Sequence, residues 1–298
     1  MKLIALITAQ SARLKQAGVS LGHGTTNAFD EAAWLVLWAL GLPLDALEAQ
    51  AHRELLPDEQ TKAEALVTQR ITTRKPAAYL THEAWLQNVP FYVDERTIVP
   101  RSFIAELLAD GEGEGTLDAW LSDETKSVLD LCTGNGSLAV IAAMAYPEVV
   151  VDAADISDDA LAVARINVDT HQLGARITLM QSDLLASVRG PYDLIVCNPP
   201  YVNTSSMAAL PAEYQAEPRL ALTGGDDGMD FIRTIIQDAP AKLSPNGVLV
   251  LEIGHERGHF EHVFRRLEVA WLETSAGDDQ VLLATREALL KWGRPRAS

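Results

Sequence analysis

The chain has 298 residues, of which 48% are hydrophobic and 22% are charged, a composition typical of a globular protein with one large domain or two ordinary ones. The net charge of -17 argues against a nucleic-acid backbone as the main partner and favours a basic protein or a neutral small molecule. Two cysteines, Cys132 and Cys197, are too few for a disulfide framework, and we expect a reducing, cytoplasmic setting.

The first 75 residues have a helical pattern. Residues 1–18 form an amphipathic stripe whose apolar run is at the short limit for a secretory signal, so we interpret it as a helix. Further helices are expected over FDEAAWLVLWALGL, residues 29–42, and from Pro57 to about Thr73. No segment approaches the ~20 apolar residues needed to cross a bilayer, and no membrane partner is expected.

A change of period and then of composition marks a domain boundary. Between Tyr79 and Val99 the apolar period shortens toward two, which predicts a hairpin. The acidic, glycine-rich run ADGEGEGTLD, residues 109–118, predicts a linker. We therefore expect a helical domain with a hairpin over residues 1–110 and a second domain over residues 111–298.

Strands and helices alternate after this linker. The expected strands are KSVLDLC (126–132), EVVVDAADI (148–156), RITLMQSD (176–183), YDLIVC (192–197), GVLVLEIG (247–254) and QVLLATR (280–286). The expected helices cover residues 137–146, 157–174, about 228–243 and about 259–267. Short apolar strands between amphipathic helices predict a parallel sheet covered on both faces, with ligands at the carboxyl ends of the strands.

The first of these strands runs into DLCTGNGS, which begins at Asp130. Gly134 and Gly136 allow a tight turn that a ligand can approach closely, and Thr133 lies beside them. The dinucleotide fingerprint does not fit, because Cys132 occupies its first glycine position. A carboxylate before the turn suits a ligand with a positive charge, such as the ammonium of S-adenosylmethionine. An ordinary strand-to-helix turn is the alternative.

Carboxylates also end the next two strands. Asp155, followed by Ile156, lies about 20 residues after the glycines, where a carboxylate can accept both ribose hydroxyls of an adenosine. A helix cap is the alternative role for Asp155, and Ser157 is an equally good cap. Asp183 can bind the adenine amino group, and Leu184 can pack on the ring. Three carboxylates at successive strand ends predict an adenosine-containing cofactor more strongly than any one of them.

The fourth strand ends in NPPY, Asn198 to Tyr201. An amide nitrogen is a poor nucleophile because its lone pair is delocalised into the carbonyl. Hydrogen bonds from its N–H groups to the side-chain oxygen of Asn198 and the carbonyl of Pro199 would orient it, and Tyr201 can pack on the flat substrate. The motif predicts methylation of a planar nitrogen, with these three residues as catalytic and Asn198 also at the cofactor. A rigid turn is the alternative.

Other polar residues carry weaker signals. His255, His259 and His262 have the spacing of a metal cluster but no cysteine or opposing ligand, so no metal site is expected. We interpret His23 as a loop residue or surface contact, because the transfer needs no titratable base. The stretch GGDDGMD, residues 224–230, is either a mobile loop over the substrate or the acidic start of a helix.

The catalytic half resembles the class I S-adenosylmethionine-dependent methyltransferases. NPPY with DLCTGNG is similar to the HemK/Prm group, which methylates protein glutamine side chains, although Asn135 stands where serine or threonine is more usual. FYVDERTIVPRS and RKPAAYL resemble the N-terminal domain of that group. GHGTTNAFDEAAWLVLWALGLPLD, VPRSFIAELL and LPAEYQAEPRLALTGGDDGMDFIR resemble its branch that acts on large-subunit ribosomal protein L-three.

This resemblance covers about residues 20 to 285 and implies a Rossmann-like fold with a seven-stranded, mostly parallel sheet. It implies methyl transfer from S-adenosylmethionine to a glutamine amide of a basic ribosomal protein, with Asn198, Pro199 and Tyr201 at the substrate. A release-factor glutamine methyltransferase, an adenine amino methyltransferase and a non-catalytic assembly factor remain alternatives. The excess of 41 Asp plus Glu over 24 Lys plus Arg argues against nucleic acid, and the intact NPPY argues against loss of catalysis.

Overall fold

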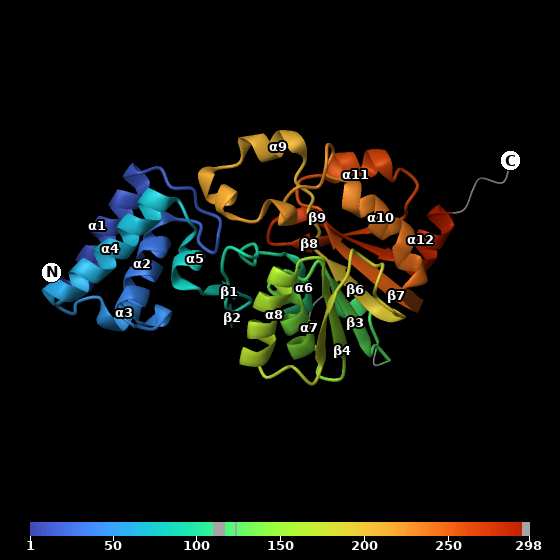
Figure 1. The fold of residues 1–298 in the computed structure, drawn as a ribbon, viewed down its shortest axis with the longest axis horizontal. Coiled ribbons are helices and arrows are strands. Elements are labelled where there is room, and N and C mark those ends of the chain that lie inside the picture. Colours follow the sequence, from blue (N-terminus) through green and yellow to red (C-terminus); the bar gives the residue numbers. More distant parts are fainter. Residues whose placement is uncertain (110–116, 123, 294–298) are drawn as a thin grey trace.

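The structure is a computed structural model that describes residues 1–109, 117–122 and 124–293. Figure 1 shows a helical domain at one end of an elongated molecule, a sheet with covering helices at the other end, and a small hairpin between them. Most of the predicted linker, residues 110–116, lies outside the described residues, so the boundary near residue 110 stays a prediction.

The N-terminal domain is built from short helices around its own core. They are α1 (Leu3–Gln16), α2 (Ala28–Ala39), the 3-10 turn η1 (Leu44–Ala46), α3 (Leu47–Gln50), α4 (Pro57–Thr73) and α5 (Ala77–Thr81). The first, second and fourth of the α-helices were predicted. Helix α2 begins where the side-chain oxygen of Asn27 accepts the backbone N–H groups of Phe29 and Asp30, which satisfies two otherwise unpaired donors.

Three of these helices contribute fully buried apolar side chains, such as Leu6, Leu35 and Val67, to one core cluster. Among the described helices, no single one is long and apolar enough to span a membrane. The bent pair Ala28–Ala39 and Leu44–Gln50, with 108° between its members, passes the same test by length and composition alone.

The hairpin is shorter than predicted. Strands β1 (Ala84–Leu86) and β2 (Val89–Phe91) pair antiparallel. The chain after β2 is irregular because side chains, rather than a neighbouring strand, bind its backbone. The N–H of Tyr92 donates to Asn167 Oδ1 at 2.7 Å, and the N–H of Val99 donates to Glu217 Oε1 at 2.9 Å. This segment leads into α6 (Ile104–Ala109) and, further on, the 3-10 turn η2 (Leu117–Ala119).

The catalytic half contains a seven-stranded sheet in the order β5-β4-β3-β6-β7-β9-β8. Its strands are β3 (Ser127–Leu131), β4 (Val150–Asp155), β5 (Ile177–Gln181), β6 (Tyr192–Cys197), β7 (Leu243–Glu252), β8 (Ala270–Thr274) and β9 (Gly277–Thr285). The pairings from β5 through to β7 are parallel, and β9 is antiparallel to both β7 and β8. The mostly parallel, seven-stranded fold is confirmed. Strand β8 was missing from the predicted elements because it is a short edge strand held by its pairing with β9.

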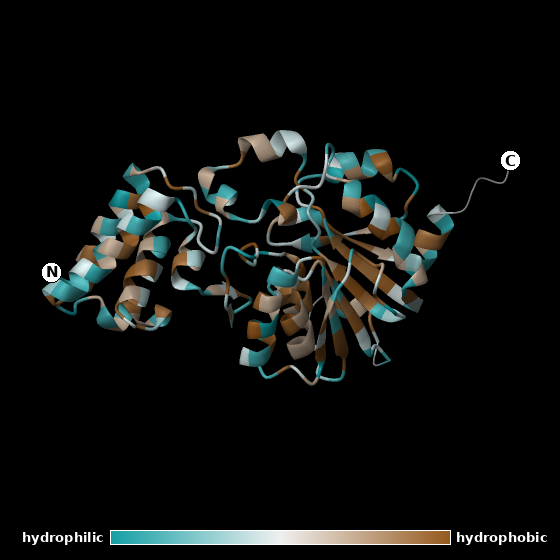
Figure 2. Ribbon diagram, in the orientation of Figure 1, coloured by the Kyte–Doolittle hydropathy of each residue, from teal (hydrophilic) through white to brown (hydrophobic). Residues whose placement is uncertain are grey.

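Helices cover both faces of this sheet. They are α7 (Ser137–Ala145), α8 (Asp158–Thr170), α10 (Asp230–Asp238), η5 (Ala239–Ala241), α11 (Arg257–Val263) and α12 (Arg286–Trp292). Helices α6, α7 and α8 share one apolar cluster with the strands, and α10, α11 and α12 share another. Figure 2 shows the hydrophobic strands between these layers. Helix α10 ends earlier than predicted, because Pro240 lacks the N–H that would continue it.

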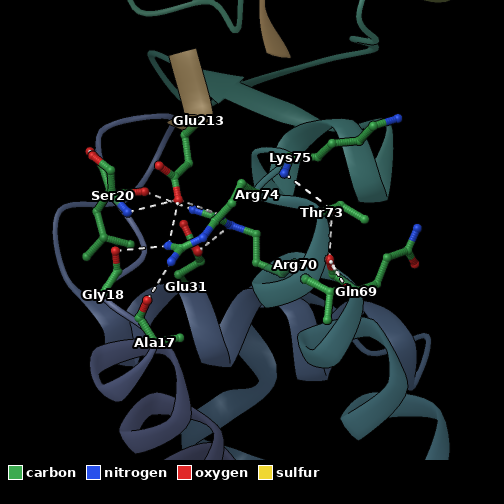
Figure 3. Close-up of polar contacts among 12 residues, drawn as sticks. Ala17, Gly18, Ser20, Glu31, Gln69, Arg70, Thr73, Arg74, Lys75 and Glu213 are labelled. Carbon is green, nitrogen blue, oxygen red and sulfur yellow. Dashed lines mark hydrogen bonds and ion pairs between the residues drawn. The ribbon is translucent and has the colours of Figure 1, made fainter. Parts of the chain in front are cut away.

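Residues 203–222, between β6 and α10, form a bridging segment that reaches the helical domain. It contains α9 (Thr204–Ala209), η3 (Ala212–Ala216) and η4 (Arg219–Ala221). Figure 3 shows its Glu213 among cationic side chains: Glu213 Oε1 lies 3.2 Å from Arg70 Nη1 and 3.3 Å from Arg74 Nη1. Arg70 also pairs with Glu31 at 2.9 Å and is fully buried. Buried charges are costly unless they are paired. The cluster therefore favours the arrangement of the two domains in which these charges are paired.

A second contact in the bridging segment involves His23, which the sequence analysis interpreted as a loop or surface residue. His23 lies in a loop, but its side chain is only 1% exposed. Its ring centroid lies 4.3 Å from that of Tyr214, and its Nε2 lies 3.6 Å from Glu217. The surface prediction was wrong because the residues that cover His23 come from the other domain.

Candidate functional site

The carboxyl ends of β3, β4, β5 and β6 surround a cavity of about 110 Å³, which we call the strand-end cavity. Six of the residues predicted at the cofactor line it: Gly134, Asp155, Ile156, Asp183, Leu184 and Asn198. They come from four different strand ends, so the parallel sheet brings together residues that span more than sixty positions of sequence.

The turn between β3 and α7 puts backbone against this cavity. Gly134 has φ +55°, and a Cβ at this position would meet no atom within 4 Å. Its N–H donates to Asp155 Oδ2 at 2.9 Å. Glycine supplies the left-handed backbone conformation and leaves the space beside it open for a ligand.

Asp130 and Thr133 lie beneath the cavity and not on its wall. Asp130 is fully buried, and its Oδ2 accepts from the Thr133 hydroxyl at 2.5 Å and from the N–H of Ala139 at 2.9 Å. Burial raises the pKa of Asp130 to about 7. Within the described part of the chain, its Oδ1 has no hydrogen-bond partner. Both residues therefore support the turn, and their direct contact with the cofactor stays a prediction.

Gly136 is likewise absent from the cavity wall, and packing explains why it is a glycine. It has φ +81°, and an added Cβ would lie 3.1 Å from the Cβ of Ala164 in α8. The start of α7 therefore approaches α8 closely. The contact of Gly136 with the cofactor stays a prediction.

Asp155 has a geometry that suits a ligand hydroxyl. Its Oδ1 accepts the N–H of Ser157 at 2.9 Å, while its Oδ2 accepts that of Gly134. Each carboxylate oxygen keeps a further lone pair for a hydroxyl donor. Burial raises the pKa of Asp155. Ser157 caps α8 through its own hydroxyl, which accepts from the N–H of Ala160 at 3.2 Å, so Asp155 is not the cap.

The end of β5 adds an exposed carboxylate and an apolar wall. Asp183 is exposed, and Leu184 is partly buried with φ +46°. The Ser182 hydroxyl donates to the carbonyl of Leu184 at 2.6 Å, which supports this unusual conformation. Together with Ile156 and Phe231, Leu184 gives the cavity the apolar surface that an adenine ring requires. Asp155 thus supplies hydrogen-bond acceptors for ribose hydroxyls, and these walls supply an apolar surface for an adenine ring.

The NPPY motif is divided between the cavity and the core. Asn198 and Pro200 line the cavity, while Pro199 is buried behind them. The Tyr201 hydroxyl donates to Glu252 Oε1 at 3.3 Å, and burial raises the pKa of Tyr201. A Cβ on Gly254 would lie 2.5 Å from the Tyr201 ring. Tyr201 therefore packs on Gly254 and is not among the residues that line the strand-end cavity, and its contact with the substrate stays a prediction.

Two glycines approach the backbone of this motif closely. A Cβ on Gly224 would lie 2.7 Å from Tyr201 Cα, and one on Gly228 would lie 2.3 Å from the carbonyl oxygen of Tyr201. Asp230 opens α10, so residues 224–229 form the loop that leads into this helix. A role of this loop over the substrate stays a prediction.

Sequence reasoning missed part of the cavity wall. Arg96, Thr97 and Ile98 reach it from the segment after the hairpin. Leu220 and its neighbours reach it from the bridging segment. None of these residues belongs to a motif with a chemical reason of its own. The signals for them were the resemblances of FYVDERTIVPRS and LPAEYQAEPRLALTGGDDGMDFIR to the HemK/Prm group.

Of the three histidines that have the spacing of a metal cluster, His259 and His262 contact neighbouring side chains. His259 Nδ1 lies 2.6 Å from Glu256 Oε2, and the other oxygen of Glu256 accepts from the Asn203 side chain at 2.6 Å. Across residues 1–109, 117–122 and 124–293, no group of three or more His, Cys, Asp or Glu is placed to hold a metal ion.

A seven-stranded, mostly parallel sheet whose first turn and following strand ends surround a cavity is the fold of a class I S-adenosylmethionine-dependent methyltransferase. Residues 113–215 match the family model of the methyltransferase small domain, and residues 5–81 match that of the PrmC N-terminal domain. The chain belongs to the ribosomal protein uL3 glutamine methyltransferases. It is an enzyme, and S-adenosylmethionine is its methyl donor.

Three relatives with that name support the assignment. The Bordetella pertussis protein is 52% identical and aligns over 95% of both chains. The Burkholderia pseudomallei protein is 53% identical over 91% of this chain and 90% of its own, and the Neisseria gonorrhoeae protein is 50% identical over 93% and 92%. Among solved structures, the hMettl16 catalytic domain is 13% identical with a TM-score of 0.52, covering 77% of this chain and 81% of its own, which shows a shared fold alone.

Proposed function

We propose that this enzyme methylates the side-chain amide nitrogen of a glutamine in ribosomal protein uL3. The observation that carries the proposal is that Asn198 lines the same cavity as Gly134 and Asp155. An amide-binding group is thereby placed next to the groups that suit the cofactor. The names of the relatives supply the substrate.

In this proposal the cofactor residues act by position. Asp155 accepts the ribose hydroxyls, Asp183 accepts from the adenine amino group, and Leu184 packs on the ring. When bound, S-adenosylmethionine supplies an electrophilic methyl group on a sulfonium. Gly134 leaves space for the ligand, and the turn below is held by Asp130 through Thr133 and Ala139.

Asn198 and Pro199 orient the substrate. The Asn198 side-chain oxygen and the Pro199 carbonyl accept the two N–H groups of the glutamine amide, which aims the nitrogen at the methyl group. Two prolines restrict the backbone that carries these acceptors. The methylated nitrogen is acidic enough to lose its extra proton to water, so the residues act by alignment and not as a strong base.

The charge of the chain supports a basic protein substrate. A net charge of -17 attracts a cationic ribosomal protein and repels a nucleic-acid backbone. We further propose that residues 1 to about 110 select the protein while the remainder performs the transfer. Action on uL3 places the enzyme in the cytoplasm.

The test is a competition for labelled methyl groups. The full chain is incubated with labelled S-adenosylmethionine and, separately, with uL3, a peptide-chain release factor and ribosomal RNA. Mass spectrometry of digested uL3 should locate a single methylated glutamine. Label on the release factor or the RNA, with uL3 unmodified, would overturn the proposal in favour of the corresponding alternative.

A further inference from the structure

A second concavity, of about 330 Å³, lies on the helical domain, away from the residues that line the strand-end cavity. We call it the indole groove. Its lining includes Gly24, Asp30, Trp34, Leu37 and Trp85. The lining residues come from the loop before α2, from α2, η1 and α3, and from strand β1, so the helical domain and the hairpin both contribute to the groove.

Trp34 forms a largely buried part of the indole groove, since its side chain is only 7% exposed. Gly24, at φ +105°, lets the neighbouring loop lie against the indole, since a Cβ there would be 3.4 Å from Trp34 Cζ3. Trp34 therefore gives the groove an apolar wall.

The rim combines an exposed aromatic wall with negative charge. Trp85 is 45% exposed although it lies on a wall of the groove. Its Nε1 donates to Glu83 Oε1 at 2.7 Å, which places one carboxylate beside the ring. Asp30, on α2, adds a second carboxylate to the rim. Apolar walls and two carboxylates together suit a peptide with an apolar side chain next to a lysine or arginine.

The hairpin and the segment that follows it connect the indole groove to the strand-end cavity. Trp85 lies on β1, and the segment after β2 supplies Arg96, Thr97 and Ile98 to the strand-end cavity. Figure 1 shows this hairpin between the helical and catalytic domains. A protein bound in the groove would therefore contact the element that borders the cavity.

We propose that the indole groove is the docking site for a basic, extended segment of uL3, distinct from the glutamine that is methylated. The inference rests on the proposed function. The segment places an apolar side chain against Trp34 and Trp85 and a cationic side chain at Asp30.

The experiment compares steady-state methylation of intact uL3 by the full-length wild type and three variants. Trp85→Ala removes one wall and should raise KM for uL3 ~10-fold, with kcat within about twofold. Asp30→Asn keeps the side-chain shape and should raise KM less, while flattening its dependence on salt. Trp120→Ala is the matched control, because Trp120 is 41% exposed and lies outside the groove.

Calorimetry of S-adenosylmethionine binding, expected to be unchanged in all variants, verifies that each one is folded. KM values for Trp85→Ala and Asp30→Asn within twofold of wild type would overturn the docking site while leaving the proposed function intact. A wild type that does not methylate uL3 overturns both. Sedimentation that shows a wild-type dimer lost in Trp85→Ala would make a second copy of the chain the occupant and overturn the inference.

Discussion

Asp155 binds two backbone N–H groups and also faces the cavity, so its substitution has graded consequences. Asp155→Ala removes every acceptor and should weaken S-adenosylmethionine binding ~10–100-fold, whereas Asp155→Asn keeps one acceptor oxygen and should lose less. Calorimetry measures both. The control is Asp159→Ala, which removes an exposed carboxylate nearby that is not on the cavity wall. Unchanged affinity in Asp155→Ala would contradict the ribose assignment.

Asn198 is expected to act on the reaction rate and not on cofactor binding. Asn198→Ala removes the acceptor that orients the amide and should lower the transfer rate ~100-fold or more. Asn198→Asp keeps an acceptor but adds charge beside the sulfonium and should also be impaired. Single-turnover methylation at saturating uL3 and cofactor is the measurement. Near-normal turnover by Asn198→Ala would show that NPPY is only a rigid turn.

Asp130 predicts a dependence of stability on pH. Its pKa in the folded protein, about 7, is raised by burial above the ordinary value near 4. The proton is thus held more tightly in the folded state. The stability that it contributes is fully present below about pH 4 and is lost as the pH rises through about 7. Asp130→Asn removes this titration.

Urea unfolding of the wild type and Asp130→Asn from pH 4 to pH 8 measures the effect. The unfolding free energy of the wild type relative to the variant should fall by roughly 2–4 kcal/mol across this range. The comparison cancels the titration of groups that the two proteins share. A difference that stays constant with pH would contradict an ionisable, buried Asp130.

At the scale of elements, the turn after β6 depends on glycines from elements far away in sequence. Gly228→Ala adds a Cβ 2.3 Å from the carbonyl oxygen of Tyr201, at a residue with φ +76°, so NPPY must move. We expect a loss of transfer rate of ~10-fold or more, because small displacements misalign the amide. Gly258→Ala is the control, since its Cβ would meet no atom within 4 Å.

Both glycine variants are assayed for methylation and for thermal unfolding. Gly258→Ala should keep full activity and the same or a higher melting temperature, because alanine is favoured over glycine in a helix. If Gly228→Ala were as active as Gly258→Ala, the close approach to Tyr201 would have no role in positioning the motif.

At the scale of the whole molecule, we expect the ion cluster of Arg70, Glu31 and Glu213 to hold the two domains together. Glu213→Gln leaves the charge of buried Arg70 balanced by Glu31 alone and should cost about 3 kcal/mol of stability. Glu95→Gln is the control, because Glu95 forms an exposed pair with Lys75 that contributes about 0–1 kcal/mol.

Urea unfolding gives the two free energies, and hydrogen exchange shows where the structure loosens. We expect faster exchange at both partners of the contact, residues 17–31 and the bridging segment, in Glu213→Gln only. Equal stability of the two variants would mean that the cluster does not hold the domains together.

The sequence alone determined the alternation of strands and helices and the residues at the strand ends. Gly134, Asp155, Asp183 and Asn198 were found because each lies at or just after the end of an apolar strand, and parallel strands end at one edge of the sheet. Local pattern suffices for such residues, because strand direction fixes where they lie. The start of α4 at Pro57 was predicted for a similar local reason.

Only the tertiary structure decided which of these residues reach the cavity and what closes it. Tyr201 turned away from the cavity because Gly254 leaves room for its ring, and Gly136 faces a helix. The bridging segment buries His23 and brings Leu220 to the cavity wall. These contacts join residues far apart in the chain, and packing selects among side-chain directions that the local sequence leaves equally open.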